Sequence, residues 1–317
     1  MTTTTTGRAG APGSGAVLLS RARPRYGERV IKGVLASAAA ISVLTTVGII
    51  VALAVPTVSF FREVSFSEFL FGTVWTPLFA DAQFGVLPLV VATLLITAIA
   101  LLVAVPLGLG AAAYLSEFAS RRSRSVLKPV LELLAGVPTV VYGFFALTFV
   151  TPLLRDLWPT DNPPSTYNAL SAGLVMGIMI LPTVASLSED AMAAVPRTLR
   201  DGAYALGSSS ATVTRKVVFP AALSGIVASV ILGISRALGE TMIVVVAAGS
   251  TARLTADPTE GMQTLTSFIA QAASGDNQVG TTGYNTIFAV GSLLFVSTLI
   301  MNVISIRLVR RFREVYE

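Results

Sequence analysis

The sequence contains no cysteine and no histidine, and it has few charged residues. Without cysteine there is no disulfide framework and no thiolate metal site. Without histidine there is no imidazole ligand and no Ser–His or Cys–His nucleophile pair. Charged residues make up 12% of the 317 residues, which is about half their share in a soluble domain. Hydrophobic residues reach 53%, and the mean hydropathy is +0.76. These values exclude a secreted enzyme, a disordered regulator and an ordinary soluble domain, and they indicate an integral membrane protein.

Five long uncharged intervals, and a sixth that is apolar except for Arg236 and Glu240, give the positions of the membrane spans. Each interval exceeds the roughly 20 residues needed to cross about 30 Å of hydrocarbon. Their uniform apolar character favours helices over barrel strands. The pattern predicts an all-α fold with six transmembrane helices in one domain, near residues 33–58, 87–115, 129–152, 168–186, 220–249 and 284–306. The first run is too long for a signal-peptide core, so we expect a retained span.

Basic residues gather in alternate connections between these spans. All but four of the 22 lysines and arginines lie in the N-terminal tail, in the loops after the second and fourth spans, or at the C-terminus. The positive-inside rule then predicts that both termini are cytoplasmic. Residues 1–29 are predicted to form a disordered, basic cytoplasmic tail, and residues 30–317 the six-helix transmembrane domain. The net charge of +5 therefore reflects orientation, and no nucleic-acid partner is expected.

The cytoplasmic loop at about 188–219 has the pattern of two short helices joined by a glycine turn. Pro196 suits a helix start, residues 197–206 can be helical, and Gly207 suits a C-terminal cap. A following serine can cap a second helix, and Pro220 opens the fifth span. An alternative is an amphipathic helix on the membrane surface, where its basic residues meet anionic lipid.

Two charged residues stand inside the fifth span. Arg236 and Glu240 are four residues apart, so they are predicted to share one face of that helix. A central arginine costs at least ~2.5–3.5 kcal/mol, which makes it a functional hypothesis. Its guanidinium can donate two parallel hydrogen bonds to a tetrahedral oxyanion, and Glu240 would hold Arg236 when the pathway is empty. The alternative is an ion pair that fixes the helix against a neighbour without touching a ligand.

Three further features are open to two interpretations each. Gly136 to Pro138 interrupt the third span, either as a kink near a pathway or as a packing notch. Glu132 lies four residues after Lys128, either mainly as a pair on the helix surface or with a role in gating. Residues 259–273 predict a short amphipathic helix, either at the outer mouth of the protein or in the membrane interface.

The cytoplasmic loop resembles the coupling loop of permeases from ABC importers. The spacing is Asp201-x5-Gly207-x9-Val217-x-Phe219-Pro220. Asp201 replaces the usual Glu and Gly202 one of the usual alanines, whereas Ala203, Gly207 and Pro220 fit the motif. In that family the loop is a coupling helix seated in a groove of the ATPase subunit.

Two other segments resemble the signatures of PstC-type permeases, one of the two membrane subunits of bacterial phosphate importers. They are residues 132–143 and residues 236–241. The resemblance implies a substrate pathway that includes Tyr142, Ser235, Arg236, Glu240 and Thr241, although Tyr142 could instead face another helix. It implies a heterodimer with a sister permease, two ATPase subunits that hold ATP and Mg, and an external phosphate-binding protein.

The chain itself is expected to be a multi-pass transport subunit in the lipid bilayer of a bacterial inner membrane, and not an enzyme. Its lysines lie in no P-loop frame, so no cofactor or metal is expected in this chain. The alternative hypotheses for its function are the sister subunit, a permease for sulfate or molybdate, a proton-coupled secondary transporter that uses Arg236 and Glu240, and a non-transporting scaffold.

Overall fold

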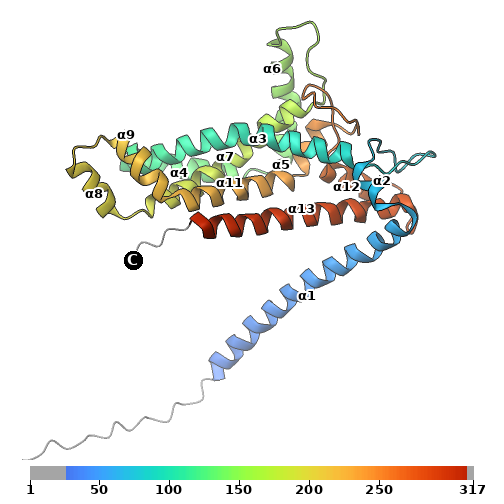
Figure 1. The fold of residues 1–317 in the computed structure, drawn as a ribbon, viewed down its shortest axis with the longest axis horizontal. Helices are drawn as coiled ribbons and strands as arrows, with labels where there is room; N and C mark the ends of the chain where they lie inside the picture. The colour runs from blue at the N-terminus through green and yellow to red at the C-terminus, as the bar shows by residue number, and fades with distance from the viewer. Residues whose placement is uncertain (1–25, 313–317) are drawn as a thin grey trace, which may run out of the picture. The chain divides into compact units, whose positions relative to one another are not determined.

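The computed structural model describes residues 26–312, and the chain divides into two compact units, residues 1–51 and 52–317 (Figure 1). In the first unit, residues 26–51 are the N-terminal part of one helix, α1 (Tyr26–Glu63). The disorder predicted for residues 1–29 is wrong for residues 26–29, which are helical. Glu28 in the first turn favours this helix start because it faces the positive end of the helix dipole. Residues 1–25 lie outside the described residues.

The described part of the chain is almost entirely helical. An isolated bridge between Trp75 and Phe84 stands apart from the helices there. Four helices are long and apolar enough to cross a membrane, namely α1, α3 (Leu87–Ala113), α7 (Ala169–Ala193) and α13 (Thr282–Phe312). Two bent helix pairs raise the number to six if each pair counts as one span. The predicted all-α membrane fold is confirmed.

The third predicted span, 129–152, is not one helix. It consists of α4 (Arg121–Ala135), α5 (Thr139–Phe145) and α6 (Thr151–Asp156), and α4 is bent by 88° from the rest. Pro138 has no N–H and disfavours helical backbone at Val137, so the helix cannot continue through this point. The predicted interruption at Gly136 to Pro138 is confirmed, and the helical segments on its two sides run in different directions.

The fifth predicted span, 220–249, is also interrupted. The pair of α9 (Ser210–Val213) and α10 (Phe219–Ala221) is bent by 72° from α11 (Leu223–Leu238). Pro220 removes a backbone donor just before this bend. A second break follows α11: Gly239 caps it, and the chain becomes helical again at Met242. The expectation of one helix over 220–249 is therefore wrong.

Figure 1 shows α3, α7, α11 and α13 running alongside one another, with α7 packed on both α3 and α11. Two glycines bring α7 close to α3. A β-carbon at Gly173 would lie 2.7 Å from the Ile99 Cβ, and one at Gly177 would lie 2.7 Å from the Ala100 carbonyl oxygen. Small residues four apart allow such backbone contact between membrane helices. Gly108 of α3 accommodates Val184 in the same way, at 3.0 Å.

The two ends of this bundle differ in structure. One end carries α8 (Arg197–Ala205), and the other carries α2 (Phe66–Phe71) and α12 (Leu265–Ser274) (Figure 1). At the α12 end, the Trp75 and Phe268 rings meet edge to face at 4.9 Å. A capping box between Thr264 and Ser267 starts α12. The helix predicted in residues 259–273 is thus confirmed, but it begins at Leu265.

Candidate functional site

The break between α11 and Met242 is the centre of the candidate substrate site. Several of its backbone groups are satisfied by nearby residues, as is needed where helix is lost at membrane depth. The Glu240 carboxylate accepts from the backbone N–H groups of Met242 (3.0 Å) and Ile243 (3.3 Å). The Glu240 carbonyl oxygen accepts from the Thr266 hydroxyl of α12 at 2.6 Å. Glu240 therefore caps the next helical segment, Met242 to Ala248, and ties the break to α12.

Arg236 lies in the last turn of α11 and interacts with α7. Its Nη1 donates a hydrogen bond to the Thr183 hydroxyl at 3.2 Å. Thr183 lies near the middle of α7, directly after Pro182. The expected pairing of Arg236 with Glu240 on one helix face is wrong, because α11 ends at Leu238 and the Glu240 carboxylate turns to the backbone beyond it.

The charge on Arg236 has no carboxylate partner within the described part of the chain. None of the ion pairs found there includes this residue. A hydroxyl offers a hydrogen bond but no countercharge, so a cation near the middle of a span remains uncompensated. This arrangement leaves donor capacity for an anion.

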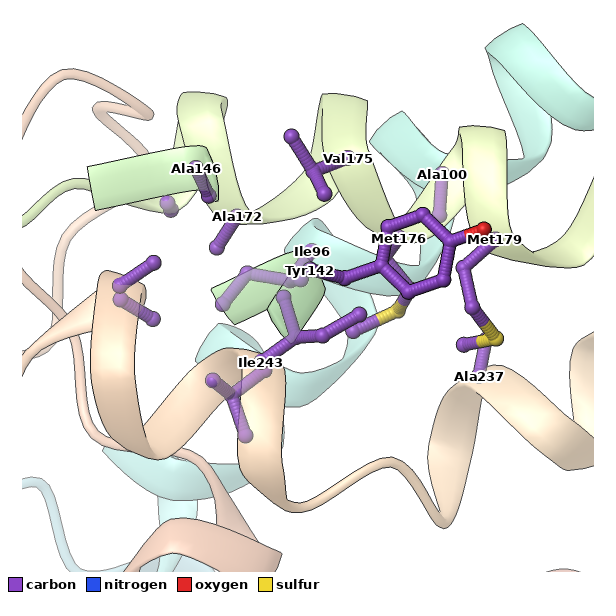
Figure 2. Close-up of a cluster of buried hydrophobic side chains, with 14 of the residues drawn as sticks. Ile96, Ala100, Tyr142, Ala146, Ala172, Val175, Met176, Met179, Ala237 and Ile243 are labelled. Atoms are coloured by element: carbon purple, nitrogen blue, oxygen red, sulfur yellow. The ribbon is translucent and has the colours of Figure 1, made fainter. Parts of the chain in front are cut away.

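Tyr142 is buried in the helix core and spans the bend between α4 and α5. Its ring lies among side chains of α3 and α7, including Ile96, Met176 and Met179 (Figure 2). Its hydroxyl donates to the Leu134 carbonyl oxygen at 2.8 Å, near the end of α4, where the Val137 N–H donates to the same oxygen at 3.3 Å. Its contact with substrate stays a prediction.

Ser235 and Thr241 complete the predicted pathway set. The Ser235 hydroxyl is buried without a hydrogen-bond partner among the described residues. Ser235 lines a cavity of about 410 Å³ whose other walls come from α7 and α13, and Asn302 and Ser305 add polar groups to it. The Thr241 hydroxyl donates to the Gly239 carbonyl oxygen at 3.4 Å. Arg236, Glu240 and Thr241 thus meet at one break, whereas Ser235 borders a separate cavity.

The predicted coupling loop, residues 188–219, forms two helices around a glycine turn, as its sequence predicts. Gly207 has a φ of +82°, in the left-handed region that favours glycine. Its N–H bonds the Tyr204 carbonyl at 2.9 Å, and the Ser208 N–H bonds the Ala203 carbonyl at 3.1 Å. Ser209 caps α9 through the Thr212 N–H at 3.4 Å. Pro196 is the N-cap of α8 rather than part of its first turn.

The residues of the predicted coupling motif lie on different sides of the loop. Asp201 and Gly202 are exposed on α8, and a β-carbon at Gly202 would meet no atom within 4 Å. Ala203 packs inward against a small apolar core that includes Met192 and Val213. Pro220 is exposed on α10, before the 72° bend. Large apolar side chains are exposed along the loop, including Leu206 at 88%.

Several charged contacts at the α8 end were not predicted from the sequence. Glu189 of α7 is buried and accepts from Arg124 and Lys128 of α4, with 2.7 Å to the Lys128 Nζ. Lys128 also pairs with Asp190 at 2.8 Å, so it binds α7 rather than the expected Glu132. Glu189 directly follows a long uncharged interval. This position at the end of a span was the sequence signal that could have identified it.

Thr183 and the Glu117–Arg200 pair, at 3.0 Å, were also missed. A threonine within an apolar span is ordinary. Arg200 and Glu117 are 83 residues apart in the chain, so no local spacing relates them.

The sequence comparisons agree with this architecture. Residues 104–314 match the family model described as binding-protein-dependent transport system inner membrane component. A Bacillus subtilis protein named probable ABC transporter permease protein YqgH is 38% identical over 72% of this chain and 73% of its own. Phosphate transport system permease protein PstC 1 of Mycobacterium tuberculosis is 38% identical, covering 73% of each chain. The PstC of Haemophilus influenzae is 32% identical over 78% of this chain and 82% of its own.

Solved structures share the fold at low sequence identity. A bacterial alginate ABC transporter, in complex with an alginate pentasaccharide-bound periplasmic protein, has a chain that matches with a TM-score of 0.61 and 14% identity. That match covers 90% of this chain and 98% of the other. The MetNI methionine ABC transporter in an inward-facing conformation matches with a TM-score of 0.53 and 19% identity, over 73% of this chain and 95% of the other. The chain therefore belongs to the family of binding-protein-dependent transport system inner membrane components, as a multi-pass membrane permease subunit of an ABC importer that leaves ATP hydrolysis to a separate subunit.

Proposed function

We propose that this chain is the PstC-type permease of an inorganic phosphate importer and forms half of the translocation pathway. Several relatives at 32–38% identity are named phosphate transport system permease proteins. Sulfate, molybdate and the sister-subunit role are the nearest rivals, and the experiment below separates the anions.

The observation that carries the proposal is the uncompensated Arg236 beside the break in the fifth span. A planar guanidinium matches a tetrahedral oxyanion and keeps its charge at all accessible pH. Thr183 holds one side of the guanidinium without neutralising it. The Glu240 carboxylate accepts hydrogen bonds from the backbone of Met242 and Ile243, so it does not compete with phosphate for Arg236. Discontinuous membrane helices often line substrate sites in transporters, which supports the placement of the pathway at this break.

The energy for transport comes from partners in this proposal. Two ATPase subunits hold ATP and Mg. A groove of one of them binds the exposed side of α8 around Asp201 and Gly202. A sister permease completes the pathway as a heterodimer, and an external phosphate-binding protein delivers the anion at the α12 end. This arrangement requires that α8 and both termini face the cytoplasm and that the chain sits in the bacterial cytoplasmic membrane, as the distribution of basic residues predicts.

Reconstitution tests the proposal. The full chain is assembled in vesicles with candidate sister permease, ATPase and binding protein, and uptake of labelled phosphate is measured with ATP inside. Unlabelled phosphate should compete with the label, whereas sulfate and molybdate should not. Arg236→Gln should abolish uptake while the complex still assembles, with Arg253→Gln as the matched loss of an exposed arginine. Normal uptake by assembled Arg236→Gln complexes would remove Arg236 from the pathway, and competition by sulfate would change the substrate.

A further inference from the structure

Arg200 of α8 donates hydrogen bonds to three groups in the neighbouring part of the permease. The Arg200 guanidinium donates to the Val195 carbonyl oxygen at 2.7 Å and to the Met192 carbonyl oxygen at 2.7 Å. It also donates to the Glu117 carboxylate at 3.0 Å. One side chain of α8 therefore bonds the end of α7 and the π-helical segment Tyr114–Phe118 that extends α3.

This contact is shielded from solvent. The side chains of Arg200 and Glu117 are 15% and 6% exposed. The Glu117 carboxylate also accepts from the Ser116 hydroxyl at 2.9 Å, which fixes its direction. Further hydrogen bonds on both partners define the geometry of such a buried charge pair. Removing one partner is strongly destabilising, because the other charge is left buried without a countercharge.

The other contacts between α8 and the bundle are less directional than these hydrogen bonds. Ala203 makes apolar contact with the core below α8, and the chain continues through the turn at Gly207. Apolar contact lacks the directionality of charged hydrogen bonds. Asp201 lies exposed on α8, and Leu206, its C-cap residue, is also exposed among the residues that the structure describes.

We propose that Arg200 is the positioning residue that transmits displacement of α8 to α3 and α7 together. This inference rests on the proposed importer function and adds the route of coupling within the permease. When the ATPase moves α8, the Arg200 guanidinium displaces Glu117, the Met192 carbonyl group of α7 and the Val195 carbonyl group that follows α7. Because α3 and α7 meet backbone to backbone at Gly177, they respond as one body.

A second buried charge cluster at the same end provides the structural comparison. Glu189 binds Arg124 and Lys128 and so fastens α4 to α7. It has no bond to α8 among the described residues. The proposal assigns the coupling role to Glu117 and Arg200 and not to burial of charge in general.

The first experiment measures ATP hydrolysis by purified, assembled complexes in lipid nanodiscs. The readout is the ratio of the rate with phosphate-loaded binding protein to the basal rate. Arg200→Gln and Glu117→Gln should each lower the stimulation by about tenfold, within the usual range of coupling between sites. Arg200→Lys should recover part of it, because the charge remains but the planar fork is lost. Arg122→Gln removes an exposed arginine of α4 and should leave the ratio unchanged.

The second experiment does not depend on the substrate. Hydrogen exchange of the complex is compared with and without ATP. In the wild type, ATP should change exchange in both residues 197–205 and residues 114–118; in Arg200→Gln, the second response should be lost. Glu117→Gln keeps the bonds of Arg200 to the Met192 and Val195 carbonyl groups and serves if Arg200→Gln does not assemble.

The outcomes separate the two hypotheses. Full stimulation and an unchanged exchange response at 114–118 in assembled Arg200→Gln and Glu117→Gln complexes would overturn the role of Arg200. An ATP response that reaches 114–118 in the wild type but is lost in the variants supports that role, even if phosphate fails to stimulate hydrolysis. That last failure would count against the proposed substrate alone.

Discussion

Arg236 of α11 donates a hydrogen bond to the hydroxyl of Thr183 on α7, at 3.2 Å. This bond joins two spans near the middle of α7, and it orients a cation that has no ion-pair partner among the described residues. The position of the guanidinium therefore depends on a neutral neighbour.

Thr183→Val should lower phosphate uptake by about tenfold, because the guanidinium loses the acceptor that orients it. A tenfold effect corresponds to about 1.4 kcal/mol, near the lower end for a hydrogen bond to a charged group. Initial uptake rates in reconstituted vesicles provide the measurement. Thr183→Ser keeps the hydroxyl and should retain most of the uptake. Equal uptake by both variants would contradict the role of this bond.

Glu240→Gln and Glu240→Ala should differ in stability. Glutamine keeps an acceptor for the backbone N–H groups of Met242 and Ile243, whereas alanine leaves them open. Loss of an N-terminal cap costs about 0.5–2 kcal/mol, so Glu240→Ala should have the lower Tm in detergent. If Glu240→Gln lost as much stability as Glu240→Ala, the charge and not the cap would be essential.

Gly207→Ala should destabilise the coupling loop by about 1–2 kcal/mol, because its φ of +82° is left-handed. A β-carbon at Gly207 meets no atom within 4 Å, so the effect comes from the backbone alone. Gly202→Ala is the matched control: it lies within α8 in equally open space, and it should stabilise the helix by about 0.5–1 kcal/mol. Thermal unfolding of both variants tests the contrast, which would fail if the two shifted Tm in the same direction.

Gly177→Ala should disturb the packing of α3 on α7. The added carbon would lie 2.7 Å from the Ala100 carbonyl oxygen, and overpacking of this kind typically costs about 1–3 kcal/mol. Gly110→Ala in α3 meets nothing within 4 Å and should be neutral or stabilising. The yield of monodisperse protein and its Tm report the difference. A Gly177→Ala variant as stable as Gly110→Ala would mean that the helices can separate without loss.

Cysteines at Ser188 and Ser229 should form a disulfide on mild oxidation. The two hydroxyl oxygens are 2.7 Å apart between α7 and α11, and the natural chain has no other cysteine. Mass spectrometry of the digested protein identifies the linked peptides. The pair of Ser188→Cys with Ser235→Cys moves one thiol about 9 Å along α11 and should not cross-link. Equal cross-linking of both pairs would contradict the register of these helices.

The general architecture could be predicted from the sequence because few residues interrupt its apolar runs. Apolar intervals indicated the positions of the membrane-crossing segments, which are four continuous helices and two bent pairs among the described residues. Gly207 marked the turn after α8 through its special backbone conformation. These features depend on neighbours in the chain, so a local pattern is sufficient to identify them.

The charged contacts could not be predicted in this way. The pairing of Arg236 with Glu240 assumed a continuous helix, but Gly239 ends α11 and turns Glu240 toward the following backbone. Glu117 and Arg200 meet only because α3, α7 and α8 converge at one end of the bundle. Such contacts depend on tertiary packing, which periodicity does not encode.

The glycine contact between α3 and α7 has a mechanical consequence. Helices whose backbones touch cannot slide along each other without first lifting apart, since each β-carbon and carbonyl oxygen blocks the next step. We therefore expect α3 and α7 to move together as one unit. The described chain changes direction at the bends at Gly136 to Pro138 and at Ala222, and it is unwound at Gly239 to Thr241. These are the positions where we expect helices to rotate. The anion site that we propose beside Arg236 lies at these unwound residues, so that movement there would change the contacts with the substrate directly.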